Sequence, residues 1–146
     1  MRKFEIVTSY LEKDINIPIR ATKLSAGYDL ESANDYEINP GEIKLVHTGL
    51  KVRLNDDEAL FIYPRSSLGI KKGLILSNAV GVIDADYYNN PDNEGHIMIP
   101  LLNFSKEVVV IKKGERVAQG IFQKYLTTSN DNTNNLRQGG FGSSGK

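Results

Sequence analysis

The feature that most constrains the fold is a series of short apolar stretches, rich in β-branched and aromatic residues, separated by turn-forming clusters. The stretches are FEIVTSY, EIKLVHTGLKVRL, EALFIYP, GLILSNAVGVIDADYY, HIMIPLLNFS, EVVVIKKG and ERVAQGIFQKY. Asn, Asp, Gly and Pro interrupt them at 39–42, 55–58, 89–95 and 112–115. This pattern predicts strands joined by turns. No window keeps a helical apolar period, and the best helix candidate is a turn or two over 66–71. We therefore predict an all-β sandwich, jelly roll or barrel.

Composition limits the classes of function. The chain has 146 residues, which favours one domain, and a formal net charge of zero, which argues against direct nucleic-acid binding. Without cysteine it has no disulfides and no thiolate chemistry. The sequence shows no membrane-spanning run and no signal-peptide core, so we expect no membrane association and a cytoplasmic protein.

The C-terminal segment RQGGFGSSGK contains a G-x-x-x-x-G-K match to a phosphate-binding P-loop. A P-loop must follow a buried strand and begin a helix, and it needs Ser or Thr after the Lys. The preceding TTSNDNTNNL is too polar for such a strand, and nothing follows Lys146, so the match is accidental. The segment still contains residue types suited to binding a phosphate: glycines that let backbone amides approach it closely, two serines, an arginine and a phenylalanine. The alternative is a disordered polar terminus.

Four other segments combine residues suited to chemistry, and each also has an ordinary structural explanation. The segment 81–87, GVIDADY, places two carboxylates at an expected hairpin bend, where acids often decorate turns. The segment 64–69, PRSSLG, could direct donors at an anion or simply cap a helix. The segment 26–30, AGYDL, sets a carboxylate in an expected polar turn. The segment 114–120, GERVAQG, carries a mid-strand Gln119 that could merely face solvent.

Taken in order and spacing, these segments resemble the motifs of the trimeric dUTPases (deoxyuridine triphosphate nucleotidohydrolases). AGYDL at 26–30 is similar to the first motif and PRSSLG at 64–69 to the second. NAVGVIDADY at 78–87 matches the third, GERVAQGIF at 114–122 the fourth, and RQGGFGSSG at 137–145 the fifth. Five motifs in series, over nearly the whole chain, are far more specific than any one of them.

The resemblance implies a distorted jelly-roll β-barrel with one short helix and a mobile C-terminal arm. The barrel domain would span 1–126, and the arm, 127–146, would carry the fifth motif. The family forms homotrimers with three active sites at subunit junctions, each using residues of all three chains. The arm would cross to a neighbour and close over the bound nucleotide.

The implied reaction is the hydrolysis of dUTP to dUMP and pyrophosphate by Mg²⁺-assisted attack of water on the α-phosphorus. It limits uracil incorporation into DNA and supplies dUMP for dTMP synthesis. Asp84 matches the general base, and Asp29 would contact Mg²⁺ only through water. The positions that match substrate-binding residues are Arg65, Ser66, Ser67, Asn78, Gly81, Tyr87, Gln119, Arg137, Phe141, Gly142, Ser143 and Ser144.

The resemblance also implies individual roles. Tyr87 would pack under the sugar and exclude a 2′-hydroxyl, while Asn78 would face the base. The backbone of 78–87 would pair with the uracil edge, and Phe141 would lie against the ring. Arg65, Ser66, Ser67 and Gln119 would hold phosphates, and Arg137, Ser143 and Ser144 would close on the terminal ones.

The sequence departs from the usual pattern in two places. The turn 88–95, YNNPDNEG, is longer than usual and resembles the version in some Gram-positive bacterial and phage enzymes. It is a candidate docking surface for a regulatory protein partner. Arg137 and Phe141 are one residue closer to each other in the sequence than the corresponding residues of the common fifth motif. His47 and His96 match no catalytic position, and we expect both in surface or turn positions.

Two rival functions remain open on the sequence. A dCTP deaminase shares the fold, but it has a different segment at 83–87 and a glutamate on the next strand, which HIMIPLLN at 96–103 lacks. A non-catalytic regulator that binds a protein partner through the 88–95 turn is the second. A bare β-sandwich binding module would make all five motifs coincidental.

Overall fold

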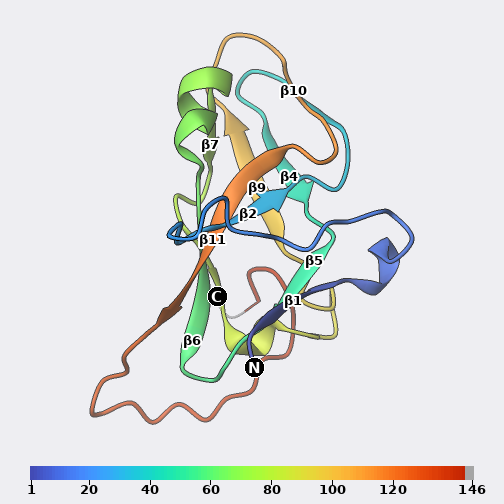
Figure 1. Cartoon of the computed structure of the whole chain (residues 1–146). Helices are drawn as coiled ribbons and strands as arrows, with labels where there is room; N and C mark the ends of the chain where they lie inside the picture. The colour runs from blue at the N-terminus through green and yellow to red at the C-terminus, as the bar shows by residue number, and fades with distance from the viewer. Residues whose placement is uncertain (144–146) are drawn as a thin grey trace.

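The computed structural model describes residues 1–143, and nearly all of its regular structure is strand (Figure 1). The strands are β1 Lys3–Ile6, β2 Tyr28–Glu31, β3 Tyr36–Ile38, β4 Ile43–His47, β5 Leu50–Arg53, β6 Glu58–Tyr63, β7 Leu74–Leu76, β8 Gly81–Ile83, β9 Met98–Asn103, β10 Val109–Ile111 and β11 Arg116–Lys124. The helical elements are the 3-10 turns η1 Thr8–Tyr10 and η3 Ala85–Tyr87 and the π-helical turn η2 Leu68–Lys72. The predicted all-β class is confirmed.

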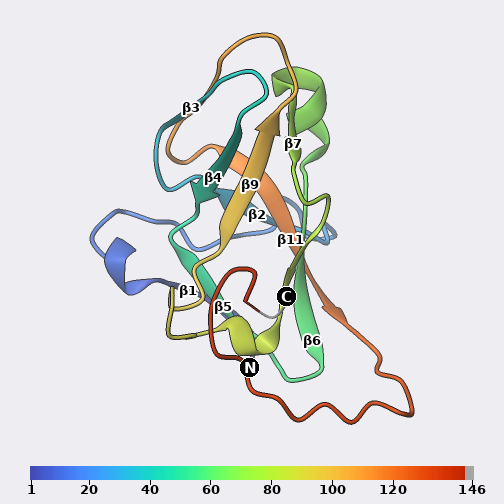
Figure 2. The ribbon, with the colours of Figure 1, turned by 180° about the vertical axis from the view of Figure 1, so that it is seen from behind.

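Antiparallel pairing joins these strands into small sheets. The order β2-β11-β6-β8 forms the largest sheet, and β4-β9-β7 forms a second one on the other side, seen from behind in Figure 2. Two pairs, β1-β5 and β10-β3, complete the body. Within residues 1–143 no helix has the length and apolar character needed to cross a membrane.

The core fills the space between the two larger sheets. Alternate residues of each strand point inward, as the period of two requires. Fully buried side chains come from both sheets and from the smaller pairs: Leu30, Ile38, Val46, Leu50, Leu60, Leu74, Ile97, Ile99, Leu101, Ile111 and Val117. The apolar stretches of the sequence therefore supply one continuous core.

Two of the predicted stretches are divided by bends. The stretch 42–54 separates into β4 and β5 at Gly49, whose φ of 75° favours glycine and whose added Cβ would lie 3.1 Å from Tyr10 and Ile15. The stretch 73–88 separates into β7 and β8 around Ala79, which has a φ of 64°. The polar turn predicted at 26–30 is wrong, because Tyr28–Glu31 is strand β2 and pairs with β11.

The chain after β11 leaves the body and returns to it. Figure 1 shows this red segment running beneath the molecule and rising again beside η3. Residues 126–136 are exposed and form no strand or helix, whereas Gly139 and Gly140 are buried. The returning segment 137–143 therefore packs against the body.

Candidate active site

A pocket of about 250 Å³ lies where β8 and η3 meet the returning arm. Apolar side chains of β6, β7 and β9 form much of its wall. Such a mixture of apolar surface and a few polar groups is typical of small-molecule sites. The structure brings seven of the predicted site residues together here: Asn78, Gly81, Asp84, Tyr87, Arg137, Phe141 and Gly142.

Strand β8 forms one side of this pocket and is an outer strand of its sheet. It pairs with β6 through Leu60–Ile83 and Ile62–Gly81, and it ends the strand order of that sheet in the described chain. An outer strand keeps peptide N–H and C=O groups that no other strand uses. Gly81 brings no side chain, so its backbone can be approached closely.

Arg137 closes one end of the pocket. Its Nε donates to Asp86 Oδ1 at 2.8 Å, and its Nη2 donates to Asp84 Oδ2 at 2.9 Å. Its side chain is only 8% exposed, and its Cζ lies 5.5 Å from the centroid of the Tyr87 ring. The guanidinium thereby offsets the repulsion between two neighbouring carboxylates. In this structure Arg137 contacts the predicted base, where the sequence pointed to a phosphate role.

Tyr87 is buried beneath the pocket and held at its hydroxyl. The hydroxyl donates to the carbonyl of His96 at 2.8 Å and accepts from Asn93 Nδ2 at 2.9 Å. Burial raises the pKa of Tyr87 above its usual value, although Asn93 and Arg137 oppose the shift. The phenol therefore stays neutral, and its ring offers a fixed apolar surface to the pocket.

The 88–95 turn is held together by its own amide side chains. Asn90 Nδ2 donates to the carbonyl of Tyr87 at 2.8 Å, and Asn90 Oδ1 accepts from the backbone of Asp92 and Asn93. Asn93 Oδ1 accepts from the N–H of Gly95 at 3.0 Å. These side-chain hydrogen bonds satisfy backbone groups that no strand pairs with, and they give the turn a defined shape.

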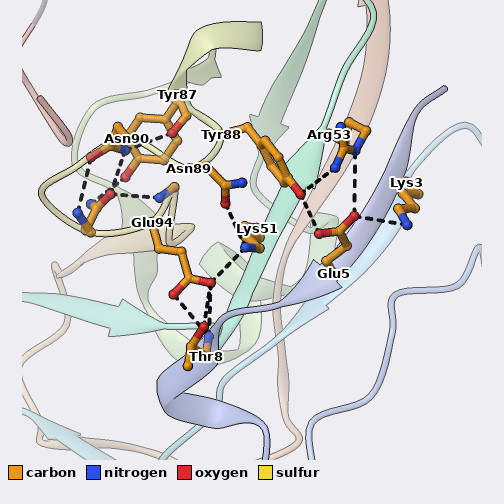
Figure 3. Close-up of polar contacts among 12 residues, drawn as sticks. Lys3, Glu5, Thr8, Lys51, Arg53, Tyr87, Tyr88, Asn89, Asn90 and Glu94 are labelled. Atoms are coloured by element: carbon orange, nitrogen blue, oxygen red, sulfur yellow. Dashed lines mark hydrogen bonds and ion pairs between the residues drawn. The ribbon is translucent and has the colours of Figure 1, made fainter. Parts of the chain in front are cut away.

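Ion pairs and hydrogen bonds anchor the same turn to the body (Figure 3). Glu94 binds Lys51 Nζ at 2.7 Å and the Thr8 hydroxyl at 3.0 Å. The Tyr88 hydroxyl donates to Glu5 at 2.6 Å and accepts from Arg53 at 2.8 Å. Lys51 holds the pKa of Glu94 below its usual value. The turn is thus fixed to β1 and β5.

A second cluster gathers three other predicted residues. Arg65 Nε donates to Asp29 Oδ1 at 3.1 Å, and Gln119 Nε2 donates to the carbonyl of Pro64 at 3.1 Å. Arg116, which the sequence analysis did not single out, lies 4.0 Å from the other oxygen of Asp29. Gly27 lies against the Gln119 side chain, and a Cβ added to Gly27 would displace the amide oxygen from its present position.

A basic pocket of about 300 Å³ adjoins this cluster, and it is lined by Arg65, Ser67, Leu68, Lys71, Lys72, Gly114, Glu115 and Arg116. Cations around a small hollow are suited to binding phosphate. Ser66 is exposed, and Ser67 at the start of η2 makes no side-chain capping bond, so capping does not explain it. The structure leaves the Ser67 hydroxyl available beside Arg65.

The remaining predicted serines belong to the arm. Ser143 Oγ lies 3.3 Å from Arg137 Nη1, and the Ser143 N–H donates to the carbonyl of Gly140 at 3.0 Å. These contacts curl the arm around Arg137. Ser144 lies outside the described residues.

The two clusters do not meet within one chain. Asp29 lies opposite Gln119, which pairs with Tyr63, whereas Asp84 follows Ile83, which pairs with Leu60. The three strand spacings from β2 to β8 correspond to roughly 14 Å, and the offset along the strands adds roughly 13 Å. Asp29 and Asp84 are therefore separated by roughly 20 Å on this geometry.

Residues 1–143 contain no group of three His, Asp or Glu side chains close enough to enclose a metal ion. Mg²⁺ keeps several waters and often uses one or two carboxylates together with substrate phosphates. Arg65 already pairs with one oxygen of the Asp29 carboxylate, so Asp29 is better suited to contact Mg²⁺ through water than to bind it directly.

Motif comparison did not assign a role to several residues beside this pocket. Asp86, noted only as one of two carboxylates in the segment 81–87, binds Arg137. Asn90, Asp92 and Asn93 contact the arm, Tyr87 or one another, and the run of Asn and Asp at 89–93 was the signal for them. His96 is also a correction. It is buried, not at the surface, because its Nε2 accepts the N–H of Gly49 at 2.9 Å and its ring packs on His47 and Tyr10.

Comparison with known proteins agrees with this arrangement. A family model described as dUTPase matches residues 13–145. The chain is 54% identical over 147 residues to "Deoxyuridine 5'-triphosphate nucleotidohydrolase" of Lactococcus lactis, with 99% of this chain and 98% of the relative covered. The crystal structure of dUTPase from Streptococcus mutans is 47% identical with a TM-score of 0.84, and the match covers 88% of this chain and 99% of that one.

A more distant likeness concerns the fold alone. A mutant dUTPase from phage phi11 of S. aureus is 19% identical with a TM-score of 0.76, over 93% of this chain and 98% of that chain. Its description mentions coordination of a structural Mg(II) ion in that protein. The predicted jelly-roll fold is confirmed by these structural matches. A family model over nearly the full length, together with a relative sharing more than half its residues, shows that the chain belongs to the dUTPase family.

Proposed function

We propose that the protein is a dUTP diphosphatase, which hydrolyses dUTP to dUMP and pyrophosphate. The observation that carries the proposal is the pocket in which Asp84, Tyr87 and Asn78 converge beside the free edge of β8. Its curated relatives bear the name of this activity. In the cell, we propose, the reaction takes place in the cytoplasm, limits uracil in DNA and provides dUMP for dTMP synthesis.

Asp84 is the general base of this mechanism. A carboxylate ionised at neutral pH accepts a proton from water while the water oxygen bonds to the α-phosphorus and pyrophosphate leaves. Arg137 donates to one oxygen of Asp84, so the catalytic state requires Arg137 to turn toward the triphosphate or Asp84 to use its other oxygen. Substrate phosphates compete for the guanidinium and favour that change.

Selection of the nucleoside rests on β8, Asn78 and Tyr87. The unpaired backbone edge of β8 hydrogen-bonds the uracil edge, and a cytosine would leave buried polar groups unmatched. The ring of Tyr87 is fixed by its hydroxyl contacts, so it cannot move aside for a ribose 2′-hydroxyl. Phe141 and Gly142 cover the base from the arm.

Phosphate binding rests on the basic cluster. Arg65 and Gln119 hold the phosphate chain with Ser66 and Ser67, and Ser143 and Ser144 join from the arm. Mg²⁺, when bound, neutralises charge on the phosphates and orients them. Asp29 fits its water shell, since its carboxylate is mostly buried and faces Arg65 and Arg116.

A complete site needs more than one copy of the chain. The separation of roughly 20 Å between Asp84 and Asp29 prevents one small reacting centre from using both within a subunit. An apolar outer face on β4-β9-β7 suits subunit contact, because exposed Ile43, Leu45 and Ile75 adjoin Pro100 and Leu102 in register. We propose that three copies form a homotrimer that pairs the two clusters across junctions.

The arm is a separate unit, with the barrel body at 1–126 and the arm at 127–146. The chain leaves the body after Tyr125, which donates to the carbonyls of Asp56 and Asp57. In the single chain the arm lies on its own subunit, in contrast to the crossing that the resemblance implies. Residues 125–136 could span roughly 40 Å when extended, so the arm can also reach a neighbouring subunit. A regulatory protein partner at 88–95 stays a prediction.

Pyrophosphate release from dUTP with Mg²⁺ tests the function, and comparison of Asp84→Asn with Asp86→Asn tests the base. Both variants weaken one ion pair of Arg137, but only the first removes the base. We expect kcat to fall about 10³-fold in Asp84→Asn, with nucleotide affinity retained, and less than about tenfold in Asp86→Asn. No pyrophosphate from the unmodified protein would refute the function. Normal turnover by Asp84→Asn would refute only the base.

A further inference from the structure

The buried glycines of the arm contact the 88–95 turn as well as Arg137 and Ser143 of the arm itself. The N–H of Gly140 donates to Asp92 Oδ2 at 2.8 Å. A Cβ on Gly139 would lie 2.6 Å from the same oxygen. A Cβ on Gly140 would lie 3.0 Å from Asn90 Oδ1 and from Asn93 Nδ2. The turn therefore fits the bare backbone of this glycine pair, and a side chain at either position would have to displace these side-chain atoms.

The shape of the 88–95 turn does not depend on contacts with the arm. Its internal amide bonds and its anchors on Lys51 and Thr8 involve no arm residue. Figure 3 shows Glu94 in contact with Lys51 and Thr8 of the body, and Asn90 in contacts within the turn. Asp92 lies at the exposed tip, where its backbone N–H is held by Asn90 and its carboxylate reaches the arm. Because the turn that carries the Asp92 carboxylate is already ordered, little conformational entropy is lost when it binds the arm.

We propose that the 88–95 turn is the docking site of the Gly139–Gly140 segment, and that Asp92 is a positioning residue that holds the arm closed. Arg137 and Phe141 flank the docked segment, so fixing Gly140 keeps the guanidinium and the ring at the pocket, where both can reach a bound substrate. Asn93 connects the docking site to the nucleoside side, because it also donates to the Tyr87 hydroxyl. The contact has the same chemistry whether the arm belongs to this chain or to a neighbouring copy.

This inference deepens the proposed function and rests on it for its kinetic consequences. A closed arm that binds substrate and transition state alike lowers KM and leaves kcat nearly unchanged. Asp92 touches the arm and not the reacting centre, so its loss should appear in KM. The proposal assigns the exposed tip of the turn to a segment of this same chain rather than to a protein partner.

The test compares Asp92→Ala, which removes the acceptor, with Asp92→Asn, which keeps an oxygen of similar reach. In Asp92→Ala we expect hydrogen exchange of segment 137–143 to rise at least about fivefold and KM for dUTP to rise about five- to tenfold. We expect kcat within about twofold, unchanged thermal stability, and recovery of most of the loss in Asp92→Asn. Glu12→Ala, which removes another exposed carboxylate, is the control and should behave as the unmodified protein.

A second pair of variants checks direct contact. Gly139→Ala should weaken arm protection strongly when Asp92 is present and less in the Asp92→Ala background, because the 2.6 Å overlap is then gone. Equal effects in both backgrounds would overturn the proposal, as would unaltered exchange and KM in Asp92→Ala. If the unmodified protein releases no pyrophosphate, the proposed function fails, while the exchange measurements still decide whether Asp92 docks the arm.

Discussion

The two clusters of predicted site residues are built by different means. The cluster around Asp84 and Tyr87 is a shaped pocket on an outer strand, closed by an extended turn and by the arm. The cluster around Asp29 and Arg65 lies where β2 pairs with β11 and where β6 leads into η2, and it adjoins a pocket rich in cations. We propose that the first recognises shape and hydrogen-bonding pattern and that the second recognises charge.

The difference shows why the chain would need partners. The pocket at Asp84 already has walls, a fixed tyrosine and a covering arm within one subunit. The cluster at Asp29 has charged groups without a nucleoside pocket beside them, because roughly 20 Å of sheet separates it from Asp84. In the proposed homotrimer, the charge cluster of one copy would lie over the pocket of another copy and complete a site for a nucleoside triphosphate.

The largest expected difference between the clusters concerns Arg65. Arg65→Ala removes a guanidinium and leaves the Asp29 carboxylate with only the distant Arg116. We expect kcat/KM for dUTP to fall about 100-fold, because an unpaired carboxylate would then repel the phosphates. Affinity for deoxyuridine, which has no phosphate, should change less than about twofold. Steady-state kinetics and calorimetry provide both values.

Lys106→Ala is the control, since Lys106 is an exposed cation that lines neither the pocket at Asp84 nor the basic pocket. Its kcat/KM should stay within about threefold of the unmodified value. A comparable loss in Lys106→Ala, or a parallel loss of deoxyuridine affinity in Arg65→Ala, would contradict the proposed division between a phosphate-binding cluster and a nucleoside pocket.

A smaller effect concerns folding stability at acidic pH. It arises from His96, whose carbonyl holds Tyr87 beneath the pocket at Asp84. Burial, with help from nearby His47, lowers the pKa of His96 from 6.5 to about 4, while Glu94 opposes the shift. Between these values the unfolded chain binds a proton that the folded chain does not, so stability falls as pH drops below 6.5. We expect about 1 kcal/mol less stability at pH 5 than at pH 7 from this residue, after allowing for partial screening by water.

Denaturant unfolding at the two pH values measures this loss, and His96→Gln, which keeps an acceptor but does not titrate, should reduce the dependence. His47→Gln should retain most of it. Hydrogen exchange at pH 5 should increase first near residues 87–97, because the His96 carbonyl holds the Tyr87 hydroxyl. An unchanged pH dependence in His96→Gln would contradict the assignment.

The sequence predicted the strands better than it predicted the contacts of the candidate site. Alternating apolar stretches located most of the core, since burial on one face imposes the period of two. They did not locate β2, because Asp29 and Tyr28 in AGYDL have the composition of a turn and become strand only by pairing with β11. The bends at Gly49 and Ala79 depend on packing against distant segments, which local composition does not contain.

Motif comparison did not predict which residues the arm contacts. The resemblance pointed to Arg137 as a phosphate ligand, but its pairing with Asp84 and Asp86 depends on how the chain returns after residue 136. The docking of Gly140 on Asp92 likewise joins residues 48 positions apart. His96 was placed at the surface because a lone histidine usually lies there, and its burial follows from the backbone N–H of Gly49.

Subunit complementation tests most directly whether the two clusters meet between copies. Asp84→Asn and Arg65→Ala proteins, each nearly inactive, are unfolded, mixed in equal amounts and refolded together. If each site takes Asp84 from one copy and Arg65 from another, about a quarter of the sites in randomly assembled oligomers are intact, and about a quarter of the unmodified activity returns. Activity that stays at the average of the two parent variants, in a mixture shown by native mass spectrometry to contain mixed oligomers, would contradict the account.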